Sequence, residues 1–63
     1  MDKMIGRKFI ITGMTIEIIS DQNEKWETRN TTTNAIIFFD KSVLQNAIKL
    51  GKAEEVSETD SKD

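Results

Sequence analysis

Three glutamates, Glu17, Glu24 and Glu27, are the side chains whose type and spacing come nearest to catalytic chemistry. Two carboxylates on neighbouring strands can serve as a general acid and a general base. The chain has no histidine and no cysteine, so the commonest proton-transfer group and the strongest nucleophile are both missing. Because carboxylates on strands and turns ordinarily face water, we expect these three to be solvated and the protein not to be an enzyme.

Binding chemistry for metals and phosphates is equally sparse. Zinc sites in proteins use cysteine or histidine ligands in their ordinary forms, and the chain offers neither. Its three glycines, Gly6, Gly13 and Gly51, lie too far apart to form a glycine-rich phosphate loop. The acidic residues after position 53 do not have the spacing of a calcium-binding loop. We therefore expect no cofactor and no metal.

Basic residues and a single tryptophan raise a second kind of chemistry, the binding of nucleic acid. Small antiparallel barrels bind nucleic acid through basic grooves and exposed aromatic rings. Residues 1–53 carry eight Lys or Arg against six Asp or Glu, which is a weak basic excess for such a footprint. We keep this as the alternative function, with these candidate residues: Arg7, Lys8, Lys25, Trp26, Arg29, Lys41 and Lys49.

The length of 63 residues predicts one small domain, which we place at residues 1–56. Residues 57–63 are almost entirely polar and acidic, and we expect them to be a disordered tail. The first eight residues lack the apolar stretch of a secretory signal, and no apolar run is long enough to cross a membrane. We therefore expect a cytoplasmic protein that does not bind membranes.

Apolar alternation on both sides of Gly13 predicts a β-hairpin from residues 8 to 19. A two-residue loop of Gly13 and Met14 puts Ile11 opposite Ile16 and gathers the large apolar residues on one face. A single long strand bent by a bulge at Gly13 is the competing interpretation. A turn with Asn23 in the left-handed region leads to a third strand at 25–30, with Trp26 on the apolar face. Residues 35–39 form the fourth strand.

Asp40 is the residue type that begins helices, and Gly51 is the type that ends them. A helix over about 41–50 then follows, with residues 52–56 as an optional fifth strand. The fold class is α+β: a small antiparallel β-sheet or open barrel of four to five strands with one C-terminal amphipathic helix packed on it. Five residues make up the predicted core-facing stripe of this helix: Val43, Leu44, Ala47, Ile48 and Leu50.

The run Ala35 to Phe39 holds more apolar surface than this architecture can cover. Successive side chains of a strand point to opposite faces, and one helix covers only one face of a sheet. The remaining set therefore needs cover from a second copy or from another protein. The other interpretation is that the strand is central and that Met1, Met4 and Ile5 fold over it. The residues that we expect at a protein interface are Ile10, Ile19, Ile36 and Phe38.

Oligomerisation or a bound partner would also compensate for the small core of so short a chain without disulfides or metals. The leading hypothesis is thus a non-catalytic protein-binding module, of which a homodimer is one form. It would act as an adaptor or inhibitor, by analogy with small proteins of phages and mobile elements. The partner is another protein or the chain itself, and nucleic acid is the alternative.

Overall fold

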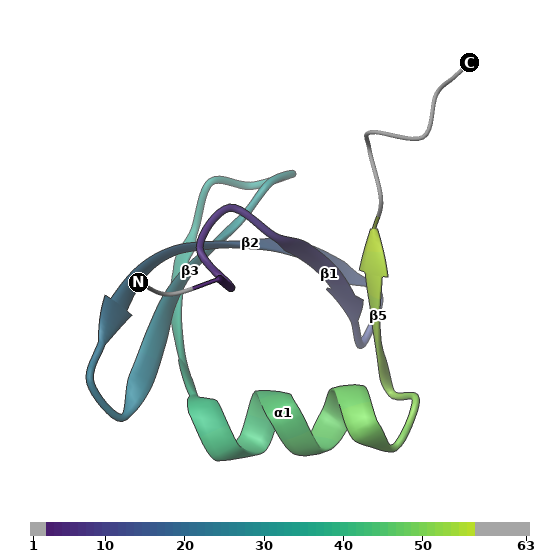
Figure 1. Cartoon of the computed structure of the whole chain (residues 1–63). Helices are drawn as coiled ribbons and strands as arrows, with labels where there is room; N and C mark the ends of the chain where they lie inside the picture. The colour runs from purple at the N-terminus through teal and green to yellow at the C-terminus, as the bar shows by residue number, and fades with distance from the viewer. Residues whose placement is uncertain (1–2, 57–63) are drawn as a thin grey trace.

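An open five-stranded antiparallel sheet curves over a single helix, and residues 3–56 make up the part of the chain that the computed structural model describes (Figure 1). The strand order is β4-β3-β2-β1-β5, so β4 and β5 are the two edges. This confirms the expected α+β fold, while the predicted acidic tail at 57–63 lies outside the described residues. The elements are β1 (Lys8–Ile11), β2 (Met14–Gln22), β3 (Lys25–Asn30), β4 (Ile36–Asp40), α1 (Lys41–Lys49) and β5 (Ala53–Val56).

The β1–β2 hairpin forms as expected, but its turn is Thr12–Gly13 rather than Gly13–Met14. Ile11 pairs with Met14 and Phe9 with Ile16, and both turn residues have positive φ, 47° and 80°. These angles are typical of a type I′ turn, whose twist matches that of the flanking strands. The predicted pairing of Ile11 with Ile16 is wrong by two residues. Since the side-chain period is two, the shift leaves the apolar face unchanged.

The next turn consists of Asn23 and Glu24, with Asn23 in the expected left-handed conformation at φ 67°. A bulge between Ile18 and Ser20 adds one residue to β2. The two-residue turn pairs Gln22 with Lys25 and Trp26 with Asp21, and Trp26 lies on the inner face and is buried. The bulge increases the local twist of β2 and helps the sheet curl.

A buried side chain organises the turn that leads into β4. The Asn30 side-chain oxygen accepts hydrogen bonds from the backbone N–H groups of Thr32 and Thr33, at 2.8 and 3.1 Å. The N–H of Asn34, which has φ 66°, donates to the Asn30 carbonyl at 2.7 Å. The chain therefore reverses within four residues, and Ala35 enters β4 in a fixed register with β3.

The helix α1 follows β4 directly. Asp40 is its N-cap residue, but the carboxylate makes no capping hydrogen bond and instead lies 3.3 Å from Lys25 Nζ. At the other end Gly51 has φ 78° and donates to the Ile48 carbonyl, while the Lys52 N–H donates to the Ala47 carbonyl. This pair of bonds is a Schellman motif, so the predicted stop at Gly51 is confirmed. The chain then turns back as β5 and pairs with β1.

The core lies between the concave face of the sheet and α1. Leu44 is the helix residue at its centre and is fully buried, with Ala47 and Ile48 packed at its margin. The predicted core positions Val43 and Leu50 are wrong, because both side chains are more than half exposed on the flank of the helix. The buried apolar residues are Phe9, Ile11, Ile16, Ile18, Trp26, Leu44 and Ala53.

From residue 3 onward, the N-terminal segment runs beside β2 rather than beside β4. The Gly6 N–H donates to the Ile18 carbonyl at 2.7 Å, and the Ile18 N–H donates to the Arg7 carbonyl at 2.9 Å. Met4 packs against the core, whereas Ile5 is exposed. β4 is an edge strand, so a central β4 is excluded, while Met1, which was expected to help cover it, lies outside the described residues. Between residues 3 and 56, the single helix is too short to cross a membrane.

Candidate functional site

The free edge of β4 is the candidate site. The hydrogen bonds at the two ends of the β3–β4 ladder show which backbone N–H and C=O groups of β4 point toward β3 and which point away. The Asn30 N–H donates to the Ala35 carbonyl at 2.8 Å, and the Lys41 N–H donates to the Glu24 carbonyl at 3.0 Å. Backbone groups alternate between the two sides of an antiparallel strand. The N–H and C=O groups of Ile36 and Phe38 consequently point away from β3, toward the side on which the described sheet has no further strand.

The side chains of these two residues lie on the outer face of the sheet, away from α1. Ile36 is 47% exposed and Phe38 is 53% exposed, whereas Ile37 and Phe39 point inward and are partly buried. We use the name "β4 edge surface" for the outward backbone groups and side chains of Ile36 and Phe38. This surface offers unpaired strand geometry and large apolar side chains at the same place, which is what strand addition requires.

The two edges of the sheet differ in charge. β5 carries Glu54 and Glu55 in the middle of its four residues, and charged side chains on an edge strand discourage pairing with other chains. β4 has no charged residue between Ile36 and Phe39, and its one carboxylate, Asp40, is held by Lys25 at the end of the strand. Of the two edges in the described part of the chain, β4 is therefore the one without charge along its apolar residues.

An ion pair joins β2 and β3 on the outer face. Arg29 Nη2 lies 2.9 Å from Glu17 Oε1, and these residues stand opposite one another on β3 and β2. Among the predicted interface residues, Ile10 is 43% exposed on β1 and Ile19 is partly buried at the bulge. The strands between separate Ile10 from Ile36, so the four predicted residues do not form one continuous apolar patch.

The glutamates considered for catalysis are not brought together. Arg29 lies opposite Glu17, while Ser20 lies opposite Glu27 and donates a hydrogen bond of 2.7 Å to its carboxylate. Glu24 lies in the β2–β3 turn and is exposed. Within residues 3–56, no group of three acidic side chains is placed to hold a metal ion. Glu17 and Glu27 thus each have a structural partner that accounts for them.

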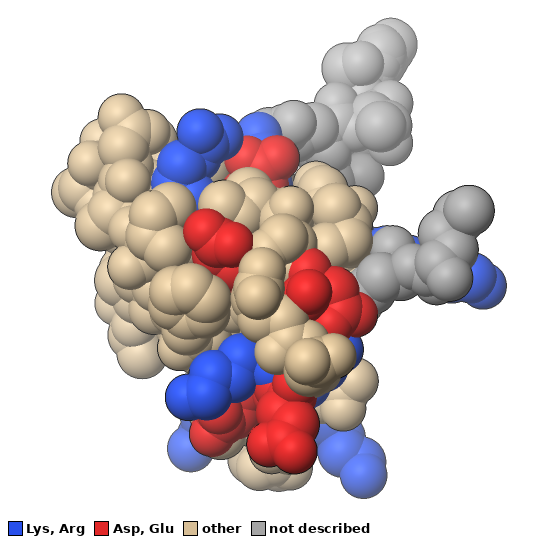
Figure 2. Space-filling view, turned by 90° about the vertical axis from the view of Figure 1, so that its left-hand side faces the viewer, with Lys and Arg blue, Asp and Glu red and all other residues tan. Residues whose placement is uncertain are grey.

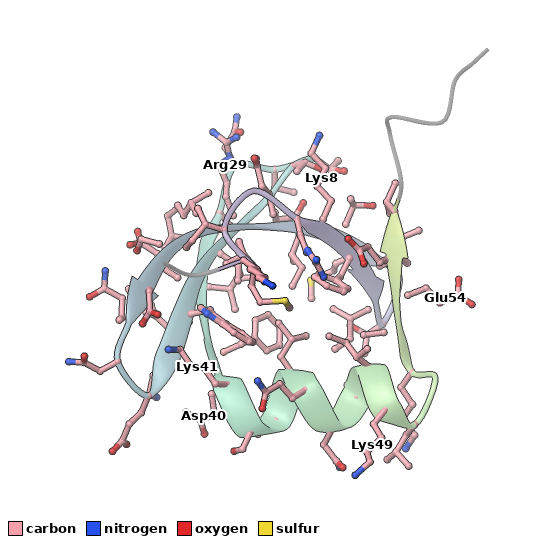
Figure 3. All side chains as sticks on the ribbon, in the orientation of Figure 1. Lys8, Arg29, Asp40, Lys41, Lys49 and Glu54 are labelled. Atoms are coloured by element: carbon pink, nitrogen blue, oxygen red, sulfur yellow. The ribbon has the colours of Figure 1, made fainter. Side chains whose placement is uncertain are left out.

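The residues considered for nucleic-acid binding lie on different sides of the molecule. Lys8 and Arg29 project from the convex side of the sheet, and Lys49 projects from the far side of α1 (Figure 3). Trp26 is only 2% exposed, so its ring cannot stack on a base in this conformation. Viewed from the side of the β2–β3 turn, acidic and basic side chains are interspersed (Figure 2).

Carboxylates also neutralise most of these cations. Lys25 pairs with Asp40 as described, Arg7 lies 3.6 Å from Glu55, and Lys41 lies 2.8 Å from Asp21. The Lys41 ammonium group also lies 5.5 Å from the centre of the Trp26 ring. The predicted set therefore divides into local pairs that stabilise the fold and does not form a basic groove.

The sequence predicted Ile36 and Phe38 as interface residues but did not place them at an edge of the sheet. A run of five apolar residues is typical of a strand that is buried on both faces, and that pattern favours a central position. The charge pattern does not indicate the edge either, because edge strands usually carry charged side chains and residues 36–39 carry none. Comparisons with protein families, curated proteins and solved structures find no match for this chain.

Proposed function

We propose that this chain is a non-catalytic protein-binding module and that it binds through the β4 edge surface. The observation that carries the proposal is the coincidence of outward backbone groups and exposed Ile36 and Phe38 side chains on an edge strand without charge. Natural sheets normally protect such an edge with charge, proline, a bulge or a covering element. An edge left open therefore suggests a surface kept for a partner.

The mode of binding is strand addition. An extended segment of the partner lies beside β4 and forms backbone hydrogen bonds with the N–H and C=O groups of Ile36 and Phe38. The apolar side chains of the partner then pack on the outer face against these two residues. Backbone hydrogen bonds contribute affinity here, and the two side chains contribute specificity. Such a module acts in the cytoplasm as an adaptor, or as an inhibitor that occupies another protein's surface.

A designed peptide tests this function without knowledge of the natural partner. The probe is a soluble peptide of alternating valine and threonine with lysines at both ends. It is added to the protein at a concentration low enough for the protein to be a monomer of 7.2 kDa. We expect the amide protons of Ile36 and Phe38 to gain protection from hydrogen exchange. The amides along the outer edge of β5 should remain unchanged.

The matched control is the same peptide with its valines replaced by prolines, which have no N–H to donate. This control should give no protection. Equal protection at both edges, or protection by the proline peptide, would contradict binding by strand addition at β4. Absence of any protection at Ile36 and Phe38 in protein that stays monomeric at all concentrations would remove the proposed function.

A further inference from the structure

We infer that the partner at the β4 edge surface is a second copy of this chain, paired β4 to β4 in antiparallel orientation about a two-fold axis. This inference rests on the proposed function and names its partner. Two identical strands that pair in antiparallel fashion are necessarily related by a two-fold axis, which closes the assembly at a dimer. The question is whether the β4 sequence is complementary to itself.

Backbone geometry restricts the registers that can form. A residue with outward N–H and C=O groups must stand opposite another such residue, so Ile36 can face only Ile36, Phe38 or Asp40 of the second copy. Centring the axis on Ile37 puts Ile36 opposite Phe38 of the second copy, and this pair occurs twice. Pairs of an aromatic and a β-branched residue are favourable across antiparallel strands. The inward face then pairs Ile37 with its own symmetry copy.

The next register, centred on Phe38, is less favourable. It would pair Phe38 with its own copy but would place Ile36 opposite Asp40 of the other chain. Asp40 already accepts the Lys25 ammonium group at 3.3 Å, and that ion pair would lie beside an apolar side chain. The register centred on Ile37 instead places Asp40 opposite Asn34, an uncharged polar residue. The register centred on Ile36 would pair Ile36 with its own copy but would place Phe38 opposite the polar Asn34. Complementarity thus favours the register centred on Ile37.

Charge also selects a closed dimer over an open chain of molecules. Pairing β4 of one copy with β5 of the next would repeat indefinitely, as head-to-tail contacts do. It would place Glu54 or Glu55 beside the apolar residues of β4. A carboxylate beside Ile36 or Phe38 would lose contact with water without gaining a polar partner. Pairing of two β5 edges would bring like charges together. Of these three combinations, only the pairing of two β4 edges brings together segments without a charged residue, namely positions 36–39 of both copies.

The expected dimer dissociates on dilution. A single strand edge buries less than the roughly 800 Å² per partner of a standard stable interface. Light scattering over a range of concentrations should therefore show the mass rise from 7.2 kDa toward twice that value. Ile36→Lys places a charge opposite Phe38 of the second copy and should weaken the dimer by at least about tenfold.

The matched control for that variant is Ile10→Lys. Ile10 has the same side chain on the same face of the sheet and nearly the same exposed fraction, 43% against 47%, but it lies on β1. This variant should dimerise like the unmodified chain. Thermal unfolding of both variants checks that each is folded. A dimer lost in Ile10→Lys and kept in Ile36→Lys would overturn the inference.

Disulfide cross-linking tests the register in a chain that has no cysteine of its own. In the register centred on Ile37, this position faces its own copy in a non-hydrogen-bonded pair, where Cα atoms lie about 4.5 Å apart. Ile37→Cys should therefore form a covalent dimer rapidly. Phe38→Cys should not, because the two introduced thiols would be offset along the strands. The reverse pattern would refute this register.

The outcomes separate the inference from the proposed function. A mass that stays at 7.2 kDa, together with no cross-link at position 37, refutes the homodimer. If the valine–threonine peptide still protects Ile36 and Phe38 in that case, the strand-addition function stands and its natural partner is a different protein. If neither the peptide nor a second copy engages the edge, both proposals fail.

Discussion

The hydroxyl of Thr28 donates a hydrogen bond to the Ile37 carbonyl across 2.8 Å, and so a buried side chain of β3 holds the edge strand β4 in place. Thr28 and Ile37 also stand opposite one another in the ladder. The contact matters for the β4 edge surface, since a rigid β4 presents Ile36 and Phe38 in fixed positions. A strand that binds by addition benefits from an edge that is already ordered.

Thr28→Val removes this hydrogen bond while it keeps the branched shape. We expect the free energy of unfolding to fall by about 0.5–1.5 kcal/mol, the usual net contribution of one such bond. Urea unfolding measures the change. The control is Thr32→Val at an exposed turn position, which should change stability by less than about 0.5 kcal/mol. Equal effects of the two substitutions would mean that the Thr28 hydroxyl does not stabilise β4.

The left-handed conformation of Thr12 gives a prediction in the opposite direction. Its φ of 47° is unfavourable for a β-branched residue, and the hydroxyl compensates only by a 2.7 Å bond to the Ile11 carbonyl. Asparagine before glycine is the preferred pair in a type I′ turn. We expect Thr12→Asn to raise the free energy of unfolding by about 1 kcal/mol, a typical relief of left-handed strain.

Thr32→Asn is the control for that gain, because Thr32 is not among the residues with positive φ. It should not stabilise the protein. Urea unfolding of the two variants, measured side by side, gives the comparison. A Thr12→Asn variant no more stable than the unmodified chain would imply that the β1–β2 turn is not of type I′ in solution.

The hairpin also shows what the sequence could and could not predict. Which residues face the core followed from alternation alone, because Phe9 and Ile16 stay on the inner face in the predicted and in the observed register. The turn did not follow, since glycine suits either central position of a two-residue loop. The bulge beside Ile19 was hidden for a similar reason: Ile18 and Ile19 are both apolar, so alternation gives no sign of an extra residue.

The helix was predicted to within one residue at each end, but its orientation was only partly correct. Periodicity places Val43 and Leu50 at the margin of the apolar stripe. The stripe alone does not show how much of the helix surface the sheet will cover. In the structure, the apolar helix residues that pack in the core are Leu44, Ala47 and Ile48. The candidate site could not be predicted for a similar reason. Its position depends on the tertiary arrangement, because only the strand order shows that β4 is an edge.

Substitution of leucines tests this orientation of α1. Leu44 is fully buried, and Leu44→Ala should lower the free energy of unfolding by about 2–5 kcal/mol through a cavity in the core. Leu50 is 60% exposed, and Leu50→Ala should change it by less than about 0.5 kcal/mol. Urea unfolding compares the same chemical change within α1 and at the C-cap residue that follows it. Similar losses at both would mean that α1 is rotated from the orientation described.

The buried indole of Trp26 provides a direct test against the nucleic-acid alternative. It is the only tryptophan of the chain and lies 2% exposed beneath the Lys41 ammonium group, so its emission should be that of an apolar environment. A base that stacked on this ring would quench its fluorescence. We expect single-stranded DNA at low salt to leave the emission unchanged.

Two controls make an unchanged signal informative. Urea should shift the emission to longer wavelength as the core opens, and Lys41→Met should alter the emission of the folded protein by removing the charge beside the ring. Both responses would show that the fluorescence reports on the surroundings of Trp26. Quenching by DNA that disappears with added salt would instead indicate phosphate contacts. In that case the tryptophan must leave the core to bind, and the basic residues around it would form the functional surface in place of β4.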